Sequence, residues 1–346
     1  MARTKYINVV SGKGGTGKTL LCTILAELMG NQNLSVLVVD MDIFVRGLTA
    51  LLYFHRGESI RLTNDNESTV SDIFYRLKPS DLQLAIHKYR SFDIAPAVSR
   101  INQLFEFEKE MIFDFEHNQR SFDRILKSIP REKYDYIFFD CRAGYDSLVS
   151  TIHENSDMTI CVQEEDDISE VTANNLIQQL ERDSSRKTIY KIINKARNIR
   201  SYDDLEKKQR QGLTTLGYIP FDMDVMNSFG EKSFWDDISR SLYKSAVAQC
   251  WNRLSAKAEL NDTLNFKRYS PLMSEKIERS FGFLGSADRL LGAMGLLVAI
   301  LGFVYSIFGE DIKLIFQNRP DKAITLFMSL IGLFLFVFSF LRSRKH

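Results

Sequence analysis

The sequence predicts an α/β protein with a doubly wound, mostly parallel sheet, followed by a hairpin of two membrane-spanning helices. Three observations lead to this fold class. A β-branched strand at 6–10 runs through a glycine-rich loop into a helix expected at 18–29, before Gly30 ends it. Apolar stretches at 35–40 and 133–140 each end in an aspartate, as buried parallel strands beside a ligand do. Two uncharged apolar runs lie further along the chain.

The loop after the first strand has the pattern G-x-x-x-x-G-K-[ST], which wraps backbone N–H groups around phosphates. Its glycines permit positive φ and a close approach of phosphate to the backbone. We expect Lys18 to reach the β- and γ-phosphates and the Thr19 hydroxyl to bind Mg²⁺. The residues expected to surround the phosphates are Gly12, Lys13, Gly14, Gly15, Thr16, Gly17, Lys18 and Thr19.

Acidic residues at strand ends complete the expected site. The carboxyl ends of parallel strands face the ligand crevice, so Asp40 and Asp42 are placed to act on Mg²⁺ or on water. Asp140 ends a strand of the Walker B form, whose aspartate holds the Mg²⁺ shell. Gly144 is placed to let its backbone approach the γ-phosphate.

These segments resemble a known family. KGGTGKT (13–19), DMD (40–42) and IFFDCRAG (137–144) are similar to the deviant Walker A ATPases, the group that includes ParA and MinD. The strand at 189–195 resembles that family's strand ending in an adenine-contacting asparagine, and 217–222 resembles its last strand and proline loop. The resemblance covers roughly residues 4–250. It implies a domain over 1–260 that binds ATP and Mg²⁺, forms a homodimer on ATP binding and hydrolyses ATP slowly.

The resemblance also implies a role for each matching residue. Lys13 is the signature lysine, which in the family reaches the nucleotide held by the opposing subunit. Lys18 holds the phosphates in its own subunit, and Asp42 orients the attacking water, so Lys13, Lys18 and Asp42 are the expected catalytic residues. The metal is supported by Thr19, Asp40 and Asp140, and adenine is contacted by Asn194 and the backbone around Pro220 and Asp222.

Arg142 departs from the family pattern, which often has a small residue or proline directly after the Walker B acid. Its guanidinium could contact phosphate, a partner or a nearby carboxylate. We favour an ion pair with a carboxylate, because such pairs are common near protein surfaces.

The two apolar runs at 290–308 and 323–341 contain no charged residue. At 1.5 Å per residue each spans roughly 28 Å, close to the thickness of the hydrocarbon core of a bilayer. We therefore expect a juxtamembrane connector at 261–288, a transmembrane hairpin at 289–342 and a basic cytosolic tail at 343–346. The segments that flank the two runs carry more basic residues than the loop between the runs. Because basic segments tend to stay in the cytoplasm, we expect both termini and the ATPase domain to be cytoplasmic, with two spans in a bacterial inner membrane.

Composition restricts the partners. The net charge is +1, from 45 basic and 44 acidic residues, and acids interrupt the basic segment at 195–211. We therefore do not expect DNA to be a partner. The four cysteines form no C-x-x-C pair, which indicates neither a zinc site nor a disulfide framework; they are Cys22, Cys141, Cys161 and Cys250.

Together these features predict a membrane-anchored ATPase whose ATP-dependent dimerisation controls an unidentified protein partner or its own hairpin. Two alternatives stay open. One is a membrane effector that forms pores or clusters according to its nucleotide state, and the other is a positioning scaffold that recruits partners or DNA to the membrane.

Overall fold

The computed structural model describes residues 3–56, 62–63, 66–75, 83–100, 114–184, 187–197 and 214–265. All of them belong to the first of the two units into which the chain divides, Met1–Tyr269. The predicted hairpin at 289–342, the tail at 343–346 and most of the connector lie outside the described residues. Within the described part of the chain, no helix combines the length and apolarity that a membrane crossing requires.

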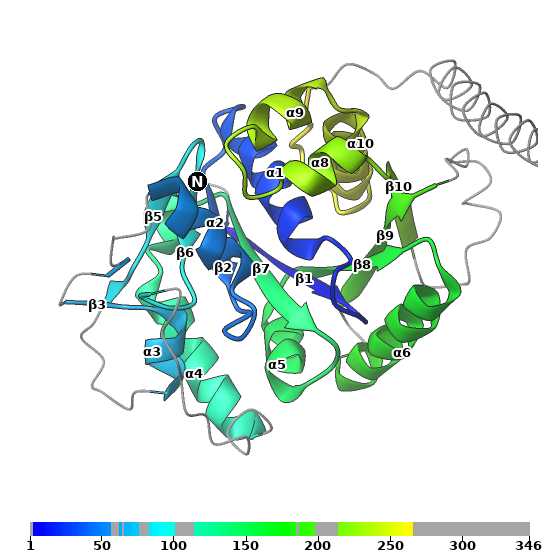
Figure 1. Ribbon diagram of the computed structural model, residues 1–346. Helices are drawn as coiled ribbons and strands as arrows, with labels where there is room; N and C mark the ends of the chain where they lie inside the picture. The colour runs from blue at the N-terminus through cyan, green and yellow to red at the C-terminus, as the bar shows by residue number, and fades with distance from the viewer. Residues whose placement is uncertain are drawn as a thin grey trace, which may run out of the picture. The chain divides into compact units, whose positions relative to one another are not determined.

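The centre of the described domain is an eight-stranded sheet with the order β10-β9-β8-β1-β7-β2-β6-β5 (Figure 1). Neighbouring strands are parallel except β5 and β6, which pair antiparallel. This confirms the doubly wound, mostly parallel sheet. The strands are β1 (Lys5–Ser11), β2 (Val36–Asp40), β5 (His87–Tyr89), β6 (Phe92–Ala95), β7 (Tyr136–Ala143), β8 (Met158–Glu164), β9 (Thr188–Ala196) and β10 (Thr214–Pro220).

Helices cover both faces of the sheet (Figure 1). One face carries α1 (Lys18–Gly30), α2 (Gly47–Arg56), α8 (Met223–Ser228), α9 (Phe234–Arg240) and α10 (Leu242–Lys257). The other carries α3 (Val70–Tyr75), α4 (Phe115–Ser128), α5 (Ser147–Asn155) and α6 (Asp167–Asp183). Short elements outside these layers are β3 (Glu67–Ser68), β4 (Gln83–Leu84) and a 3₁₀ turn at Arg131–Lys133.

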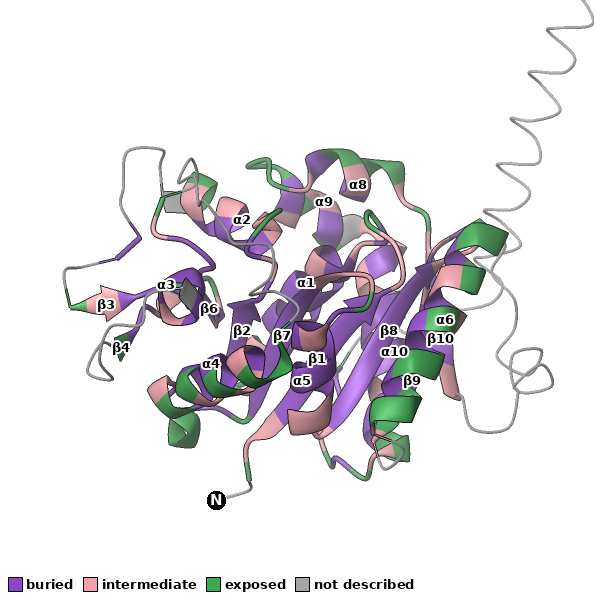
Figure 2. Ribbon diagram, turned by 90° about the horizontal axis from the view of Figure 1, so that it is seen from below, coloured by how far each residue is buried: buried purple, intermediate pink, exposed green. Residues whose placement is uncertain are grey.

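The two layers bury separate hydrophobic clusters because successive side chains on a strand point to opposite faces. Ile7 and Phe138 pack with α1 and α10, whereas Tyr6 and Phe139 pack with α4 and α5. Figure 2 shows the result, with buried strands in the middle and exposed residues on the outer faces of α4 and α6. Burial on both sides explains why these strands are continuous apolar runs in the sequence.

Two predicted boundaries differ from the structure. The strand expected at 133–140 starts later, at Tyr136, because a 3₁₀ turn occupies Arg131–Lys133, and it continues past Asp140 to Ala143. Arg142 is therefore part of β7. The sequence from 236 to 260 also has a helical pattern, which the structure divides into α9 and α10 at Ser241, whose hydroxyl accepts a hydrogen bond from the Tyr243 N–H as an N-cap.

The helix predicted at 18–29 extends one residue further, so Gly30 is the last residue of α1. A Cβ at this position would lie 2.3 Å from the Ser91 carbonyl oxygen, so glycine is needed for close contact with the β5–β6 turn. The same contact includes buried Glu27, whose carboxylate pairs with Arg90 at 2.9 Å and accepts from the Ser91 N–H at 3.2 Å. Gly30 therefore serves packing.

The chain stays packed on the domain beyond the predicted boundary at 260. Leu260 and Leu264 are buried in the cluster around α10. The Tyr136 hydroxyl, at the start of β7, hydrogen bonds to the Asp262 carboxylate. The Trp251 indole N–H donates to the Asp262 carbonyl at 3.2 Å. Residues 258–265 are thus attached at the amino end of β7.

We predict that Gly30→Ala lowers the free energy of unfolding. Alanine gains about 0.5–1 kcal/mol over glycine within a helix, but forcing a methyl group against backbone costs about 1–3 kcal/mol. The expected net loss is up to about 2.5 kcal/mol, measured from urea unfolding followed by circular dichroism. Gly14→Ala is the matched control, because nothing lies within 4 Å of a Cβ there. Equal stability of the two variants would contradict the packing role.

Candidate functional site

The glycine-rich loop lies between β1 and α1 and uses its glycines in two ways. Gly15 and Gly17 have φ of 79° and 90°, which favour glycine. Gly12 instead allows the loop to approach α6, because a Cβ there would lie 2.3 Å from the Thr172 carbonyl carbon. The loop is therefore fixed from both sides, by its own backbone and by α6.

Lys18, the first residue of α1, is buried, with 8% of its surface exposed. Its ammonium donates to the Ser11 hydroxyl at 2.8 Å. The Thr16 hydroxyl is also buried and has no hydrogen-bond partner among the described residues. A buried cation and an unused hydroxyl beside a helix N-terminus fit a phosphate ligand.

A cavity of about 720 Å³ opens along the loop and the start of α1. Its two ends differ in chemistry. One end is lined by Met226 and Phe229, from α8 and the turn after it, together with Lys195 of β9. The other end is lined by Thr19, Asp42 and Arg142 among others. An apolar end and a polar end match the base and the terminal phosphates of a nucleotide, and the size is that of a small-molecule site.

Asp40 and Asp140 form a buried acidic pair beside the phosphate loop. They are register partners, Asp40 as the last residue of β2 and Asp140 within β7, and 0% and 1% of their surfaces are exposed. Burial and then repulsion from Asp140 raise the pKa of Asp40 to about 8. Burial raises the pKa of Asp140 to about 6, against the opposing hydrogen bond from Thr19. Two such carboxylates side by side are stabilised by a cation.

The residues present fit Mg²⁺. One oxygen of Asp140, Oδ1, is buried without a hydrogen-bond partner among the described residues, and the Thr19 hydroxyl lies against the same carboxylate. In the described chain no three His, Cys, Asp or Glu side chains gather into a metal cage. Mg²⁺ bound with nucleotide needs none, because water and phosphate oxygens supply most of its ligands.

Asp40 organises the neighbouring loop. Its Oδ2 accepts from the Thr49 N–H at 2.8 Å and the Thr49 hydroxyl at 2.6 Å, and its Oδ1 accepts from the Asp42 N–H at 3.2 Å. Thr49 in turn accepts from the Ala97 N–H at 2.8 Å. Asp40 therefore joins β2, α2 and the end of β6. Sequence reasoning missed Thr49, because a threonine inside a helix start gives no signal of its own.

Asp42 lines the cavity and shapes the loop that follows it. Its Oδ1 accepts from the Val45 N–H at 3.0 Å, and its carbonyl accepts from the Arg46 N–H at 2.8 Å. Phe44 and Val45 stand out from this loop, with 41% and 77% of their surfaces exposed. Asp42 thus lines the same cavity as Lys18 and Thr19.

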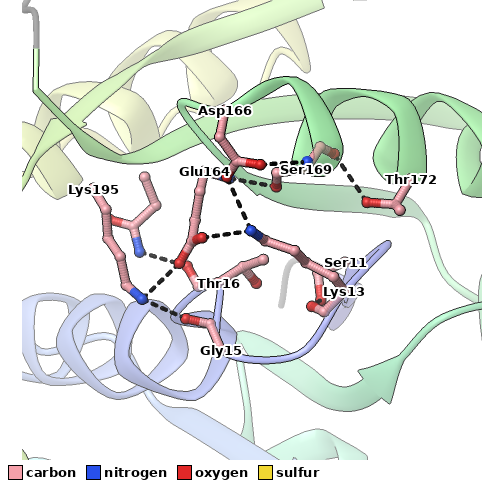
Figure 3. Close-up of polar contacts among 10 residues, drawn as sticks. Ser11, Lys13, Gly15, Thr16, Glu164, Asp166, Ser169, Thr172 and Lys195 are labelled. Carbon is pink, nitrogen blue, oxygen red and sulfur yellow. Dashed lines mark hydrogen bonds and ion pairs between the residues drawn. The ribbon is translucent and has the colours of Figure 1, made fainter.

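Lys13 points away from this cavity and is held by acids of its own chain (Figure 3). Its ammonium lies 2.8 Å from Glu164 at the end of β8 and 2.9 Å from Asp166, the N-cap of α6. Hydrogen bonds to these two acids raise the pKa of Lys13. The Lys195 ammonium contacts Glu164 and the Gly15 carbonyl, each at 2.6 Å.

Sequence reasoning missed Glu164, Asp166 and Lys195. The rule applied to Asp40 would have found Glu164, since Glu164 also ends a buried parallel strand. Burial opposes ionisation of Glu164, but hydrogen bonds from Lys13 and Lys195 outweigh it and lower its pKa. The acid is therefore charged and shared by two lysines.

The residues expected to contact adenine lie behind the cavity wall. Asn194 is fully buried, its amide N–H₂ donates to the Thr16 carbonyl at 2.7 Å, and its oxygen accepts from the Tyr243 hydroxyl at 2.9 Å. Pro220 ends β10, and Asp222 caps α8 by accepting from the Asp224 and Val225 N–H groups. These residues position the loop and α8, while Met226 and Phe229, which sequence reasoning missed, face the cavity.

The end of β7 gives Arg142 and Gly144 distinct settings. Arg142 pairs with Asp146 at 2.9 Å, which confirms the expected ion pair. Gly144 has a φ of 87° and open space around its Cβ position. Its N–H donates to the Ser11 carbonyl at 2.8 Å, which ties β7 to the phosphate loop.

Comparisons with known proteins agree with this geometry. A family model described as an AAA domain, AAA_31, matches residues 4–195. The putative septum site-determining protein MinD of Mesostigma viride is 25% identical over 65% of this chain and 74% of its own length. The chloroplastic minD homologue of Arabidopsis thaliana is 26% identical over 65% of this chain and 66% of its own length.

Solved structures share the fold. MinD of Pyrococcus horikoshii, complexed with Mg-ADP, aligns with a TM-score of 0.54 and 22% identity over 75% of this chain and all of its own. MinD of Aquifex aeolicus aligns with a TM-score of 0.54 and 21% identity over 76% of this chain. The family model covers more than half of the 346 residues. The chain therefore belongs to the AAA_31 family and is a P-loop ATPase similar to MinD and ParA.

Proposed function

We propose that the protein is an ATP-dependent dimerisation switch. The observation that carries the proposal is the position of Lys13, which belongs to the phosphate loop but does not line the cavity of its own chain. Its side chain is 30% exposed, so it can reach a ligand held by another molecule. A lysine supplied across an interface makes each site complete only in the dimer.

The surface around the cavity supports association with a second copy. Phe44, Val45, Ile168 and Val171 are exposed apolar residues on the loop after β2 and the first turns of α6. Both elements border the phosphate loop, through Asp42 and through the contact of Gly12 with Thr172. An exposed apolar patch beside an incomplete site is typical of a protein interface.

Each residue of the site has a defined task in this proposal. Lys18 and the loop N–H groups bind the phosphates, and Asp42 orients the attacking water beside them. Thr19 and Asp140 would hold Mg²⁺, which neutralises phosphate charge when bound, and Asp40 supports them by fixing the adjacent loop. Met226 and Phe229 receive the base, while Asn194, Pro220 and Asp222 place the loop and α8 around it.

We further propose that the chain is anchored in the membrane by the apolar runs at 290–308 and 323–341. Their length and lack of charge support two helical spans, with the ATPase domain and both termini on the cytoplasmic side. A permanent anchor keeps the switch at the bilayer in both nucleotide states. The output is then a partner, or the hairpins themselves, brought together by dimerisation.

The first test compares wild type, Lys13→Ala and Asp42→Ala. We expect wild type to show ATP-dependent crosslinking between subunits and an ATP turnover that rises with protein concentration. Lys13→Ala loses both, whereas Asp42→Ala retains association and loses turnover by about 100-fold or more. Lys133→Ala, on the exposed 3₁₀ turn, is the control. A wild type that neither hydrolyses ATP nor changes its association would disprove the proposal.

The second test concerns the acids that hold Lys13. The double variant Glu164→Gln and Asp166→Asn preserves shape and the α6 cap but removes both negative charges. We expect half-maximal ATP-dependent association at a protein concentration about 2- to 5-fold lower, because exposed ion pairs are worth up to about 1 kcal/mol. Analytical ultracentrifugation measures this. Weaker association would mean that the acids contact Lys13 of the second copy instead.

The third test addresses the anchor. The full chain is compared with a chain that ends at Asn265, the last described residue. We expect the full chain to remain with membranes after an alkaline wash, and the shortened chain to appear in the soluble fraction with its nucleotide binding intact. Recovery of the full chain in the soluble fraction would refute the anchor while leaving the switch in place.

A further inference from the structure

Arg142 is a charged group of the cavity whose binding capacity is only partly used. It stands two residues after Asp140 on β7 and lines the cavity with Thr19 and Asp42. Its Nε forms an ion pair with an oxygen of Asp146 at 2.9 Å. Its guanidinium carbon lies 5.3 Å from the centre of the Phe44 ring. Among the described residues, its two terminal NH₂ groups have no hydrogen-bond partner.

These two supports fix the guanidinium rather than neutralise it. Asp146 is buried, with 1% of its side chain exposed, and it also caps α5 by accepting from the Val149 N–H at 2.8 Å. Its position is therefore set by the helix. A cation–π contact with Phe44 places the guanidinium against the loop that contains Asp42. The group is preorganised, with two donors left for an anion.

The sheet order shows which part of a nucleotide Arg142 meets. The phosphate loop follows β1, the apolar end of the cavity is formed from β9 and α8, and Arg142 lies on β7, on the other side of β1. A nucleotide with its base at Met226 and Phe229 extends its phosphates across the loop toward β7. Its last phosphate then lies beside Arg142 and Asp42.

We infer that Arg142 binds the γ-phosphate of ATP within its own subunit and so discriminates ATP from ADP. Guanidinium groups form paired, charge-assisted hydrogen bonds to phosphate oxygens. Lys18 contacts both the β- and the γ-phosphate, whereas Arg142 adds a contact that only the triphosphate can make. The inference rests on the proposed nucleotide function and deepens it, because it identifies the group that senses the nucleotide state.

The contact also reaches the loop after β2. Phe44 lies on the Arg142 guanidinium and is itself exposed at the proposed interface. A γ-phosphate that binds the Arg142 guanidinium therefore also affects the position of the Phe44 side chain. The Arg142 side chain thus links the nucleotide state to the shape of the proposed interface.

The test is calorimetric titration of the full chain, in detergent with Mg²⁺, by ADP and by the non-hydrolysable analogue AMPPNP. We expect Arg142→Ala to weaken AMPPNP binding by about 10- to 100-fold, the range of charge-assisted hydrogen bonds, and ADP binding by less than about 3-fold. Arg142→Lys keeps the positive charge but loses the paired N–H donors of the guanidinium. We expect its affinity for AMPPNP to lie between those of wild type and Arg142→Ala. Arg120→Ala, an exposed arginine of α4, is the matched control and changes neither affinity.

Asp146→Asn separates binding from a structural role. Asparagine retains the cap of α5 but removes the charge that holds Nε. Because Asp146 helps to hold the guanidinium, we expect a loss of AMPPNP affinity smaller than that of Arg142→Ala, with ADP affinity changed by less than about 3-fold. If Asp146→Asn weakens ADP binding as much as AMPPNP binding, or if Arg142→Ala weakens both nucleotides equally, Arg142 is structural and the inference is overturned.

A Lys13→Ala background removes the contribution expected across the interface. The loss caused by Arg142→Ala is expected to persist there, and its disappearance would overturn action within one subunit. If wild type binds both nucleotides and Arg142→Ala changes neither affinity, this inference is rejected and the proposed function is not. Failure of wild type to bind either nucleotide would reject the proposed function as well.

Discussion

Two buried carboxylates, Asp40 and Asp140, lie side by side on neighbouring parallel strands, and the surrounding site is arranged around their charge. Parallel pairing of β2 and β7 forces this contact, because it makes the two acids register partners. Asp40 satisfies its oxygens through Thr49 and Asp42, whereas Asp140 keeps one oxygen unpaired. Asp40 therefore stabilises the loop after β2, whereas Asp140 keeps an oxygen available to bind a ligand.

Much of this fold could be predicted from the sequence, because its signals are local. The strands are short apolar runs, and the phosphate loop is a motif of fixed spacing whose flanking strand and helix are visible on either side. The acids that follow the apolar runs predicted that Asp40 and Asp140 would lie close together, and they are register partners in the sheet. The limits of β7 were less predictable, since the apolar run gives no sign that Arg131–Lys133 turns away from the sheet.

The candidate site was less predictable where it depends on contacts between distant segments. Lys13 meets Glu164 and Asp166 more than 150 residues later, and no local pattern encodes that pairing. The contact of Asn194 with adenine stays a prediction from resemblance, whereas its hydrogen bond to the Thr16 carbonyl had no signal in the sequence. Gly30 was taken as a helix stop, although its role depends on Ser91 of another element. Such roles become visible only when the chain is folded.

The attachment of residues 258–265 gives β7 a mechanical meaning. One end of this strand is bonded through Tyr136 to Asp262, and the other carries Asp140 and Arg142. At about 3.3 Å per residue the strand is roughly 26 Å of backbone held rigidly between parallel neighbours. Asn252 of α10 also exchanges two hydrogen bonds with the Leu264 backbone, at 2.9 and 2.6 Å. The segment after α10 therefore connects this helix to the strand that carries Asp140 and Arg142.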